Sequence, residues 1–271
     1  MLSKSFFIFD VNISQVCYMI KVKDFFIKEN RIDEIPEEAY NAVATILEDI
    51  DAFARTTYRS VYVIDYYRQN FLYVSENPLF LCGMDASEVR QLGYKFYINQ
   101  VPSEDLNLLL EANSVGFQFI QNIPIKEKKN YTISYDFHII NSLSQKKQLI
   151  NHQITPLRLT ENGQVWLGLC TASISSGNRF GELVMSKYKS KQFWIYNRQK
   201  RKWMEMSRPE LKDMEREVLK LSAMGYTMNE IADIISRSFD TVKSYRKSLL
   251  EKLDVANISE AISFAINYRL I

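Results

Sequence analysis

The chain of 271 residues is poor in the residue types that build catalytic, metal and disulfide sites. It contains only two histidines, His138 and His152, and three scattered cysteines, Cys17, Cys82 and Cys170. This cysteine spacing suits neither a disulfide framework nor a metal site, and so small a number fits a reducing cytoplasm. A glycine-rich phosphate loop and a nucleophile elbow are also missing. These absences argue against an enzyme.

Long apolar runs are missing as well. The cluster Phe6–Phe9 stops at Asp10 and is too short for the core of a signal peptide. No uninterrupted apolar run approaches the roughly 18 residues that a membrane span needs. We therefore expect a cytoplasmic protein without a membrane partner.

The few reactive side chains also fit structural roles. His138 lies between Phe137 and Ile139 in a strand-like run, which favours a structural imidazole over a catalytic base or a haem ligand. Cys82 lacks the Asn-Cys-Arg-Phe context of flavin-binding light sensors and is interpreted as a small buried residue. The paired acids and downstream lysine of a phosphoacceptor receiver domain are absent. No cofactor is therefore predicted.

The last 61 residues, from Leu211 to Ile271, show four apolar-periodic segments separated by helix start and stop signals. The first predicts an amphipathic helix up to Met224, which Gly225 ends. In the second, Thr227 and Glu230 form a capping box at the start of a helix of about two turns. The residues predicted to be buried are Leu211, Met214, Val218, Leu219 and Leu221 in the first helix, and Ile231, Ile234 and Ile235 in the second.

A third segment combines a buried stripe with a basic outer face. Ser238 is predicted to cap this helix, and Asp240 lies favourably in its positive first turn. Residues three or four apart share one face of a helix, so one set of side chains points inward and another points outward. The inward set is Val242, Tyr245, Leu249 and Leu253, and the outward set is Lys243, Ser244 and Lys247.

A fourth helix is predicted after Asn257, which repeats the capping arrangement with Glu260. Its buried residues are expected to be Ala261, Ile262, Ala265 and Ile266. Charge is balanced over residues 207–271, but five cations oppose two acids between Ser236 and Lys252. A local basic face is typical of DNA binding and also of an ordinary solvated surface.

The order and spacing of these motifs resemble the LuxR-type (GerE-like) helix-turn-helix signature over about a quarter of the chain. The matching motifs are Glu215-Arg216-Glu217-Val218-Leu219-Lys220-Leu221, Gly225, Glu230-Ile231-Ala232, Thr241-Val242-Lys243, Glu251-Lys252-Leu253-Asp254-Val255 and Glu260-Ala261-Ile262. The resemblance implies that the third helix reads the DNA major groove, that the second braces it and that the last pairs two copies. The candidate DNA-contacting residues are Thr227, Arg237, Ser238, Thr241, Lys243, Ser244, Arg246 and Lys247.

Five positions depart from this signature. Lys212 stands where a capping threonine is usual, so Asp213 or Ser207 is expected to cap the first helix. Arg237 replaces an aliphatic residue in the turn before the third helix, and base preference is therefore not carried over. The remaining departures are Asp254 and Arg269 in place of glycine and Ile258 in place of arginine, the last two at the expected dimer face.

The earlier part of the chain alternates between helical and strand periodicity. Pro36 is predicted to open a helix, short helices are expected over residues 78–97, and a longer helix follows Pro102. The stripe of the first of these helices is Val43, Ile46, Leu47, Ile50 and Phe53. The predicted strands are residues 61–64, 71–74, 131–139, 148–159 and 165–173. This order resembles a PAS domain, a five-stranded antiparallel sheet cupped by helices.

The resemblance to a PAS domain implies a cup whose candidate lining residues are Tyr62, Tyr73, Phe137 and Leu169. An aromatic, apolar cup of this kind either binds a small, partly apolar molecule or is filled by its own side chains. The filled core is the favoured interpretation, because no cofactor-attachment residue stands out. The identity of any ligand is left open.

Residues 177–206 contain three short strand-like runs, and residues 186–206 carry seven cations against one acid. We predict a small β-meander that bridges two domains, because aromatic residues need burial and glycine and proline are too scarce for a flexible linker. Its cations are interpreted as keeping an exposed edge strand soluble, with contact to DNA phosphates as the alternative.

The predicted fold is α+β, with a PAS-like five-stranded antiparallel sheet and a C-terminal four-helix domain. The predicted parts are an N-terminal helical segment (1–58), the PAS-like domain (59–176), the basic connector (177–206) and the helix-turn-helix domain (207–271). The predicted function is a DNA-binding transcriptional regulator under the control of the PAS-like domain. The alternative is an interaction module whose degenerate helical domain docks a protein. Expected partners are double-stranded DNA, a second copy of the chain and RNA polymerase.

Overall fold

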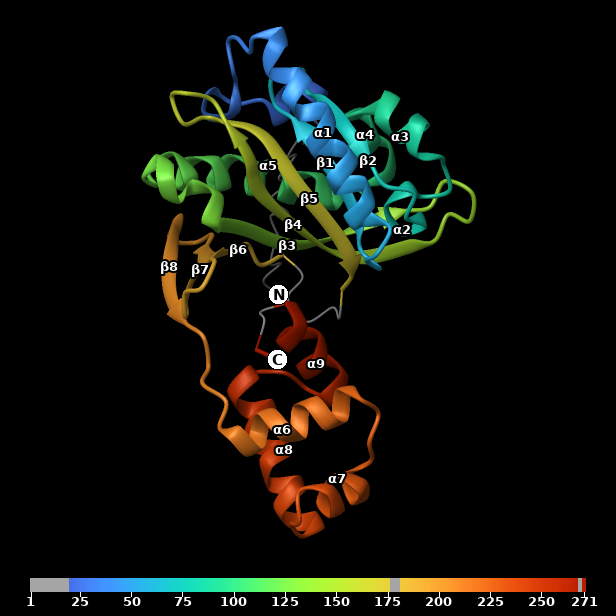
Figure 1. The fold of residues 1–271 in the computed structure, drawn as a ribbon, viewed down its shortest axis with the longest axis vertical. Helices are drawn as coiled ribbons and strands as arrows, with labels where there is room; N and C mark the ends of the chain where they lie inside the picture. Colours follow the sequence, from blue (N-terminus) through green and yellow to red (C-terminus); the bar gives the residue numbers. More distant parts are fainter. Residues whose placement is uncertain (1–19, 176–180, 268–269) are drawn as a thin grey trace, which may run out of the picture.

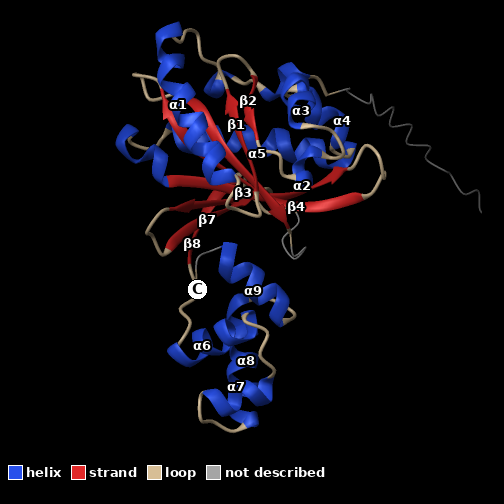
Figure 2. Ribbon diagram, turned by 45° about the vertical axis from the view of Figure 1, so that its right-hand side comes forward, coloured by secondary structure: helices blue, strands red, loops and turns tan. Residues whose placement is uncertain are grey.

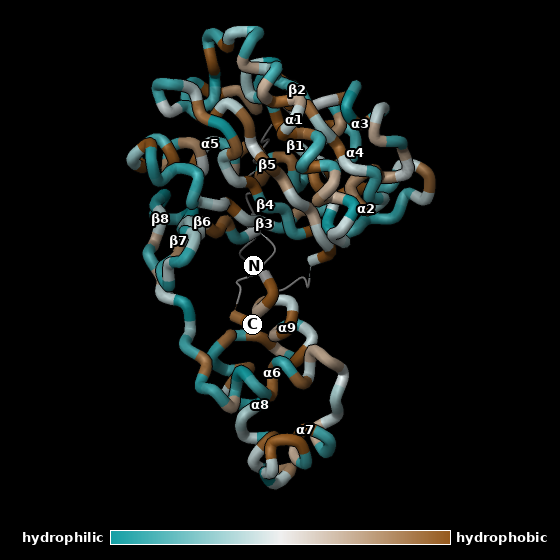
Figure 3. The backbone as a smooth tube through the Cα atoms, viewed as in Figure 1, coloured by the Kyte–Doolittle hydropathy of each residue, from teal (hydrophilic) through white to brown (hydrophobic). Residues whose placement is uncertain are grey.

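The computed structural model describes residues 20–175, 181–267 and 270–271, and shows a sheet-and-helix part followed by a helical part (Figure 1). The apolar cluster Phe6–Phe9 and Cys17 lie outside the described residues. Residues 207–210 connect the two parts and are hydrophilic along most of their length (Figure 3).

The N-terminal part is built on the predicted antiparallel sheet, drawn in red in Figure 2. Its first five strands lie in the order β2-β1-β5-β4-β3. The order of elements predicted along the chain, two strands followed by helices and then three strands, is confirmed. The strands are β1 (Ser60–Asp65), β2 (Asn70–Val74), β3 (Tyr131–Ile140), β4 (Lys147–Leu159) and β5 (Val165–Ile174). Because side chains alternate across a strand, each strand contributes residues to both faces of the sheet, and every residue of β1 is buried.

Helices cover both faces of this sheet, with α1 in front of β1 and β5 and α5 behind them in Figure 1. The helices are η1 (Val22–Phe25), η2 (Lys28–Asn30), α1 (Glu37–Ala54), α2 (Pro78–Leu81), α3 (Ala86–Leu92), α4 (Lys95–Gln100), α5 (Ser103–Gln121) and η3 (Ile125–Asn130). The predicted helix after Pro36 is confirmed, although Phe53 of its stripe is 58% exposed. The arrangement is that of a PAS-like sheet cupped by helices.

The connector forms the three expected strands, but they do not stand apart as a bridge between domains. They are β6 (Val184–Lys187), β7 (Gln192–Asn197) and β8 (Lys202–Ser207). β6 pairs with residues 131–134 of β3, so the five-stranded sheet continues into one of eight strands. Pairing satisfies backbone groups that the edge of β3 would otherwise leave exposed.

Aromatic packing fixes the connector to the N-terminal part. Trp194 and Trp203 lie 5.4 and 5.3 Å from the ring of Phe119 on α5. Three of its cations form ion pairs: Lys187 pairs with Glu127 at 2.6 Å, and Arg198 and Lys191 pair with Glu111 and Glu210, each at 2.5 Å. These contacts support the structural interpretation of the basic strip.

The C-terminal part contains the four predicted helices, α6 (Asp213–Ala223), α7 (Met228–Ile234), α8 (Phe239–Leu253) and α9 (Ile258–Asn267). Gly225 follows α6 with φ of 92°, the left-handed conformation that the sequence predicted for a helix end. Lys212, rather than Asp213 or Ser207, occupies the N-cap of α6. Its main-chain N–H donates to the Glu215 side chain at 2.7 Å, and its own side chain makes no capping hydrogen bond.

Two small hydrophobic clusters hold these helices together. One consists of Leu211, Leu219, Leu249, Leu253, Ala261, Phe264 and Ala265, and the other of Val218, Leu221, Ile231, Ala232 and Val242. Three predicted core residues lie outside them: Met214 is half-buried, Ile234 is 50% exposed and Ile266 is 44% exposed. Ile266 instead lines a groove with Tyr58 and Ile174 of the N-terminal part.

A buried carboxylate connects α6 to α8. Glu215 on α6 is 1% exposed and accepts hydrogen bonds from Lys252 at 2.7 Å and Ser248 at 2.8 Å, both on α8. Burial raises the pKa of Glu215, but the hydrogen bonds from Lys252, the Lys212 backbone and Ser248 outweigh it, and the net pKa lies below the usual value. The ion pair therefore fixes α6 against α8.

Glu215→Gln is expected to destabilise the C-terminal part by about 2–3 kcal/mol, because it leaves Lys252 without its partner. Hydrogen exchange of peptides from α6 and α8 measures this loss locally. Since the folded pKa is lowered, the stabilisation is present above the unfolded value of about 4.3 and is lost as pH falls through the folded pKa.

Glu217→Gln is the matched control, since the Glu217 side chain on the same helix is 42% exposed. All three tryptophans precede residue 207, so their fluorescence should report an unchanged N-terminal part in both variants. Equal exchange rates in the two variants would show that the buried pair does not stabilise the helical part.

Candidate functional site

The α7–α8 pair has its turn and both helix starts fixed by local hydrogen bonds. Thr227 caps α7, and its main-chain N–H donates to the Glu230 side chain at 2.7 Å. The intervening turn contains Ser236 with φ of 53°. Ser238 caps α8 by accepting the Thr241 N–H at 3.2 Å. These bonds orient the start of α8 relative to α7, as the capping patterns predicted.

The two faces of α8 are sorted as helical spacing predicted. Val242 and Leu249 are fully buried, whereas Lys243, Ser244 and Lys247 are exposed. Tyr245 is half-buried and packs on the cluster around Val242, and Arg246 is half-buried as well. The outer face of α8 is therefore free to enter a DNA groove without unpacking the domain.

The structure brings part of the predicted contact set together. Lys243, Arg246 and Lys247 line one open groove with Met228, the first residue of α7. Lys247 also lies 3.8 Å from Glu251, an exposed pair one turn away. Thr227 directly precedes Met228 in the sequence, and Arg237 is exposed in the turn between α7 and α8.

Two of the proposed contact hydroxyls are already engaged. The Ser238 and Thr241 hydroxyls lie 2.8 Å apart, within hydrogen-bond distance, so they form part of the helix start.

Phe239 was not singled out from the sequence, because it falls outside the apolar stripe of α8. It is the first residue of the helix and is 41% exposed. Its neighbour Asp240 is exposed too. The first turn of α8 thus presents an aromatic ring and a carboxylate rather than a cation.

The predicted PAS-like pocket set is divided between the two faces of the sheet. Tyr62 and Phe137 are fully buried in the core. Val63 pairs with both Tyr73 and Leu169, so these side chains lie on the opposite face from Tyr62. There the Tyr73 hydroxyl donates to Asp51 of α1 at 2.9 Å. The inclusion of Tyr73 and Leu169 was wrong, since strand runs alone do not fix the register between strands.

The cup itself is filled by its own side chains. Tyr62 stacks on Phe80 with ring centroids 4.2 Å apart, and its hydroxyl lies 2.6 Å from that of Tyr97 and also bonds His152. Burial lowers the pKa of His152 to about 3, so this imidazole is neutral. The remaining apolar cavity, beside Gly116, measures about 40 Å³, far below a typical ligand pocket.

Three other reactive side chains in the described part of the chain are buried or close to a partner. Burial raises the pKa of the Cys82 thiol to about 12, and Cys170 is fully buried. The His138 ring lies 2.9 Å from Asp105 at the start of α5. Among the described residues, no three His, Cys, Asp or Glu side chains gather as a metal site. Within the same residues, none of the helices is long and apolar enough to cross a membrane.

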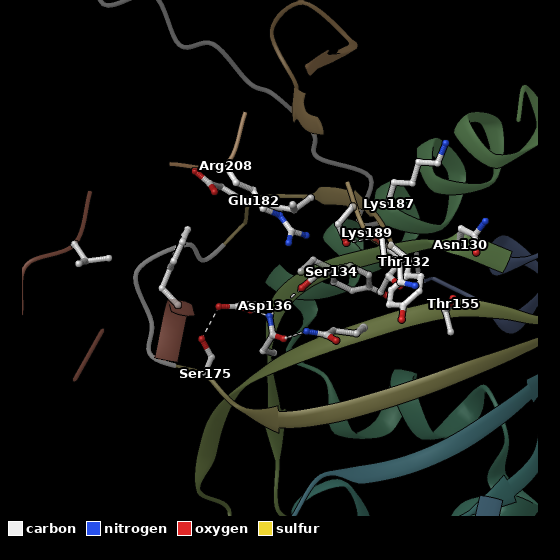
Figure 4. Close-up of a pocket in the computed structure, with 18 of the residues that line it drawn as sticks. Asn130, Thr132, Ser134, Asp136, Thr155, Ser175, Glu182, Lys187, Lys189 and Arg208 are labelled. Carbon is white, nitrogen blue, oxygen red and sulfur yellow. Dashed lines mark hydrogen bonds between the residues drawn. The ribbon is translucent and has the colours of Figure 1, made fainter. Parts of the chain in front are cut away.

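A polar cleft of about 510 Å³ separates the sheet from the helical part (Figure 4). Figure 4 shows Lys187 and Lys189 toward one end and Asp136, Ser175 and Glu182 toward the other. Its sheet side is lined by Thr132, Ser134, Asp136, Asn151, Gln153 and Thr155, and its helical side by Val255, Glu260 and Phe264. Asn151 donates to Asp136 at 2.7 Å. The lining is therefore mostly polar on the sheet side, whereas the helical side adds the apolar Val255 and Phe264.

Comparison with known proteins places the helical part in a family. Residues 210–265 match the model of the luxR family of bacterial regulatory proteins. They form a LuxR-type helix-turn-helix domain, and the chain is a DNA-binding transcriptional regulator. No curated protein matches the chain.

Several solved structures resemble the chain at low identity. A phage VqmA–DPO complex is 15% identical over 85% of this chain and 90% of its own, with a TM-score of 0.32. The Vibrio cholerae VqmA dimer is 16% identical over 82% of this chain and 87% of its own, and its TM-score is also 0.32. A PAS/PAC sensor domain of a Marinobacter aquaeolei diguanylate cyclase is 13% identical over 43% of this chain and 94% of its own, and its TM-score is 0.32 as well. TM-scores of this size do not establish a shared overall arrangement.

Lys243→Ala is expected to weaken DNA binding by about 1–3 kcal/mol and to leave the melting temperature nearly unchanged, because Lys243 is exposed. Val242→Asp should instead unfold the helical part, since it buries a charge in a fully enclosed site. Anisotropy titrations and hydrogen exchange distinguish the two effects. Equal losses of stability in both variants would mean that the inner and outer faces of α8 are reversed.

Proposed function

We propose that this regulator reads DNA with the exposed face of α8 in the major groove. The observation that carries the proposal is the separation of a fully buried Val242 and Leu249 from an exposed Lys243 and Lys247 on one capped helix. Recognition helices of helix-turn-helix domains enter the groove in this way, with their N-terminal residues at the base edges. Lys243 and Lys247 then contact phosphate or guanine, and Ser244 lies between them.

Residues at the edge of this surface supply phosphate contacts in our proposal. Thr227 lies at the start of α7, where its N–H and hydroxyl both donate to the Glu230 carboxylate, so a phosphate contact there would have to replace one of these bonds. Arg237 is exposed in the turn, and Arg246 borders the groove beside Lys243. Phosphate contacts position the domain without reading sequence. Contact with RNA polymerase stays a prediction.

We further propose that the chain binds DNA as a homodimer. On α9, Phe264 is 7% exposed and belongs to the core, whereas Ile266 is 44% exposed and offers apolar surface. Exposed Phe53 at the end of α1 and Tyr58 after it add apolar surface on the N-terminal part. VqmA, a similar structure, is described as a dimer.

The PAS-like domain, in our proposal, relays or dimerises rather than holding a ligand in its cup. The support is the filled core around Tyr62, whose remaining cavity of about 40 Å³ has room for about one water molecule. A cavity of that size excludes a small metabolite unless core side chains move. The eight-stranded sheet would then transmit a change at its outer face to the helical part through residues 207–210.

Saturable DNA binding with steep salt dependence is the expected result of anisotropy titrations against genomic fragments at two salt concentrations. Each cation that neutralises a phosphate contributes about −0.9 to the slope of log K against log salt. Lys247→Ala should therefore reduce the slope by about one. Absence of saturable binding would favour the alternative function, a degenerate domain that docks a protein.

A full DNA site should be bound by two copies, with half-sites about 34–36 Å apart. Ile266→Asp is expected to weaken dimer formation on DNA without unfolding the domain, because Ile266 is 44% exposed. Met224→Asp, at a residue 70% exposed outside α9, serves as the control. Footprinting that protects one asymmetric half-site at saturation, with a 1:1 stoichiometry in sedimentation, would refute the dimer.

A further inference from the structure

The first residue of the recognition helix carries an aromatic side chain that remains 41% exposed. This residue, Phe239, directly follows the N-cap Ser238. It belongs to neither hydrophobic cluster of the helical part, whose members on α8 are Val242, Leu249, Leu253 and the half-buried Tyr245 and Leu250.

Helix geometry places Phe239 on the side of α8 that faces DNA in the proposed function. Residues four apart lie on adjacent turns of one side, so Phe239 precedes exposed Lys243, and Lys247 follows one turn later. The start of a recognition helix is the part that approaches base edges most closely. An aromatic ring at this position therefore accompanies the cations into the groove.

The chemistry of the first turn points to bases rather than phosphates. Phe239 has no hydrogen-bonding group, and the adjacent Asp240 is an exposed carboxylate that phosphate would repel. The major groove presents one prominent apolar group, the C5-methyl of thymine, and phenylalanine is among the side chains that contact it. An exposed ring gains stabilisation by covering this methyl from water.

We propose that Phe239 determines specificity by packing against the C5-methyl group of a thymine in each half-site. The inference rests on the proposed function of α8 and names one base that this helix recognises. Lys243 and Lys247 supply contacts that depend on charge, whereas Phe239 supplies one that depends on a single methyl group.

The test replaces thymine by uracil, which removes this methyl group and leaves base pairing intact. The full-length protein first selects its site from a random duplex pool, and each thymine of the selected half-site is then replaced in turn. One replacement should weaken binding about fourfold, the effect expected for one buried methyl group. The same replacement should have no effect on Phe239→Ala, which should keep the melting temperature of the wild type.

Lys243→Ala is the control, because it should bind more weakly yet retain the thymine-to-uracil ratio of the wild type. Equal affinity of the wild type for every uracil-substituted site would overturn the proposal while leaving DNA binding intact. An unchanged thymine-to-uracil ratio in Phe239→Ala would also overturn it. Failure to select any DNA sequence would instead refute the proposed function on which the inference rests.

Discussion

The ion pair between Glu215 and Lys252 is the constraint on which presentation of the recognition helix depends. The core of the helical part consists of two small hydrophobic clusters. The carboxylate of Glu215 on α6 accepts a hydrogen bond from Lys252 in the last turn of α8. A buried carboxylate is unfavourable alone, but three hydrogen bonds compensate it here. Because its bonds are directional, the pair fixes one orientation of α8, and with it the direction in which Lys243 and Phe239 point.

The helical part was predictable from sequence because its signals are local. The capping pairs at Thr227 and Ser238 and the left-handed Gly225 act within a few residues, and each was observed as expected. The two exceptions differ in range. Lys212 stands at the N-cap of α6, where Glu215 three residues later accepts its main-chain N–H, whereas Ile266 lines a groove with residues of the N-terminal part that are distant in sequence.

The sheet was predictable in strand order but not in lateral extent. Strand runs in the connector are short and aromatic, a pattern that also suits an independent meander. Pairing of β6 with β3 is a contact across more than 50 residues, which no local pattern encodes. The same limit explains the error at Tyr73 and Leu169: alternation assigns faces within a strand, while the register between strands decides which faces coincide.

The position of α9 connects the two parts of the molecule to dimer formation. Ser263 and Ile266 of α9 line a groove whose opposite wall is Tyr58, Leu79 and Ile174 of the N-terminal part. A surface that faces its own N-terminal domain cannot at the same time pair with a second copy. If α9 is the pairing helix, DNA binding as a dimer therefore requires the helical part to turn away from the sheet. Such a movement exposes the apolar wall of this groove to water, so contacts in the dimer or with DNA must offset the loss.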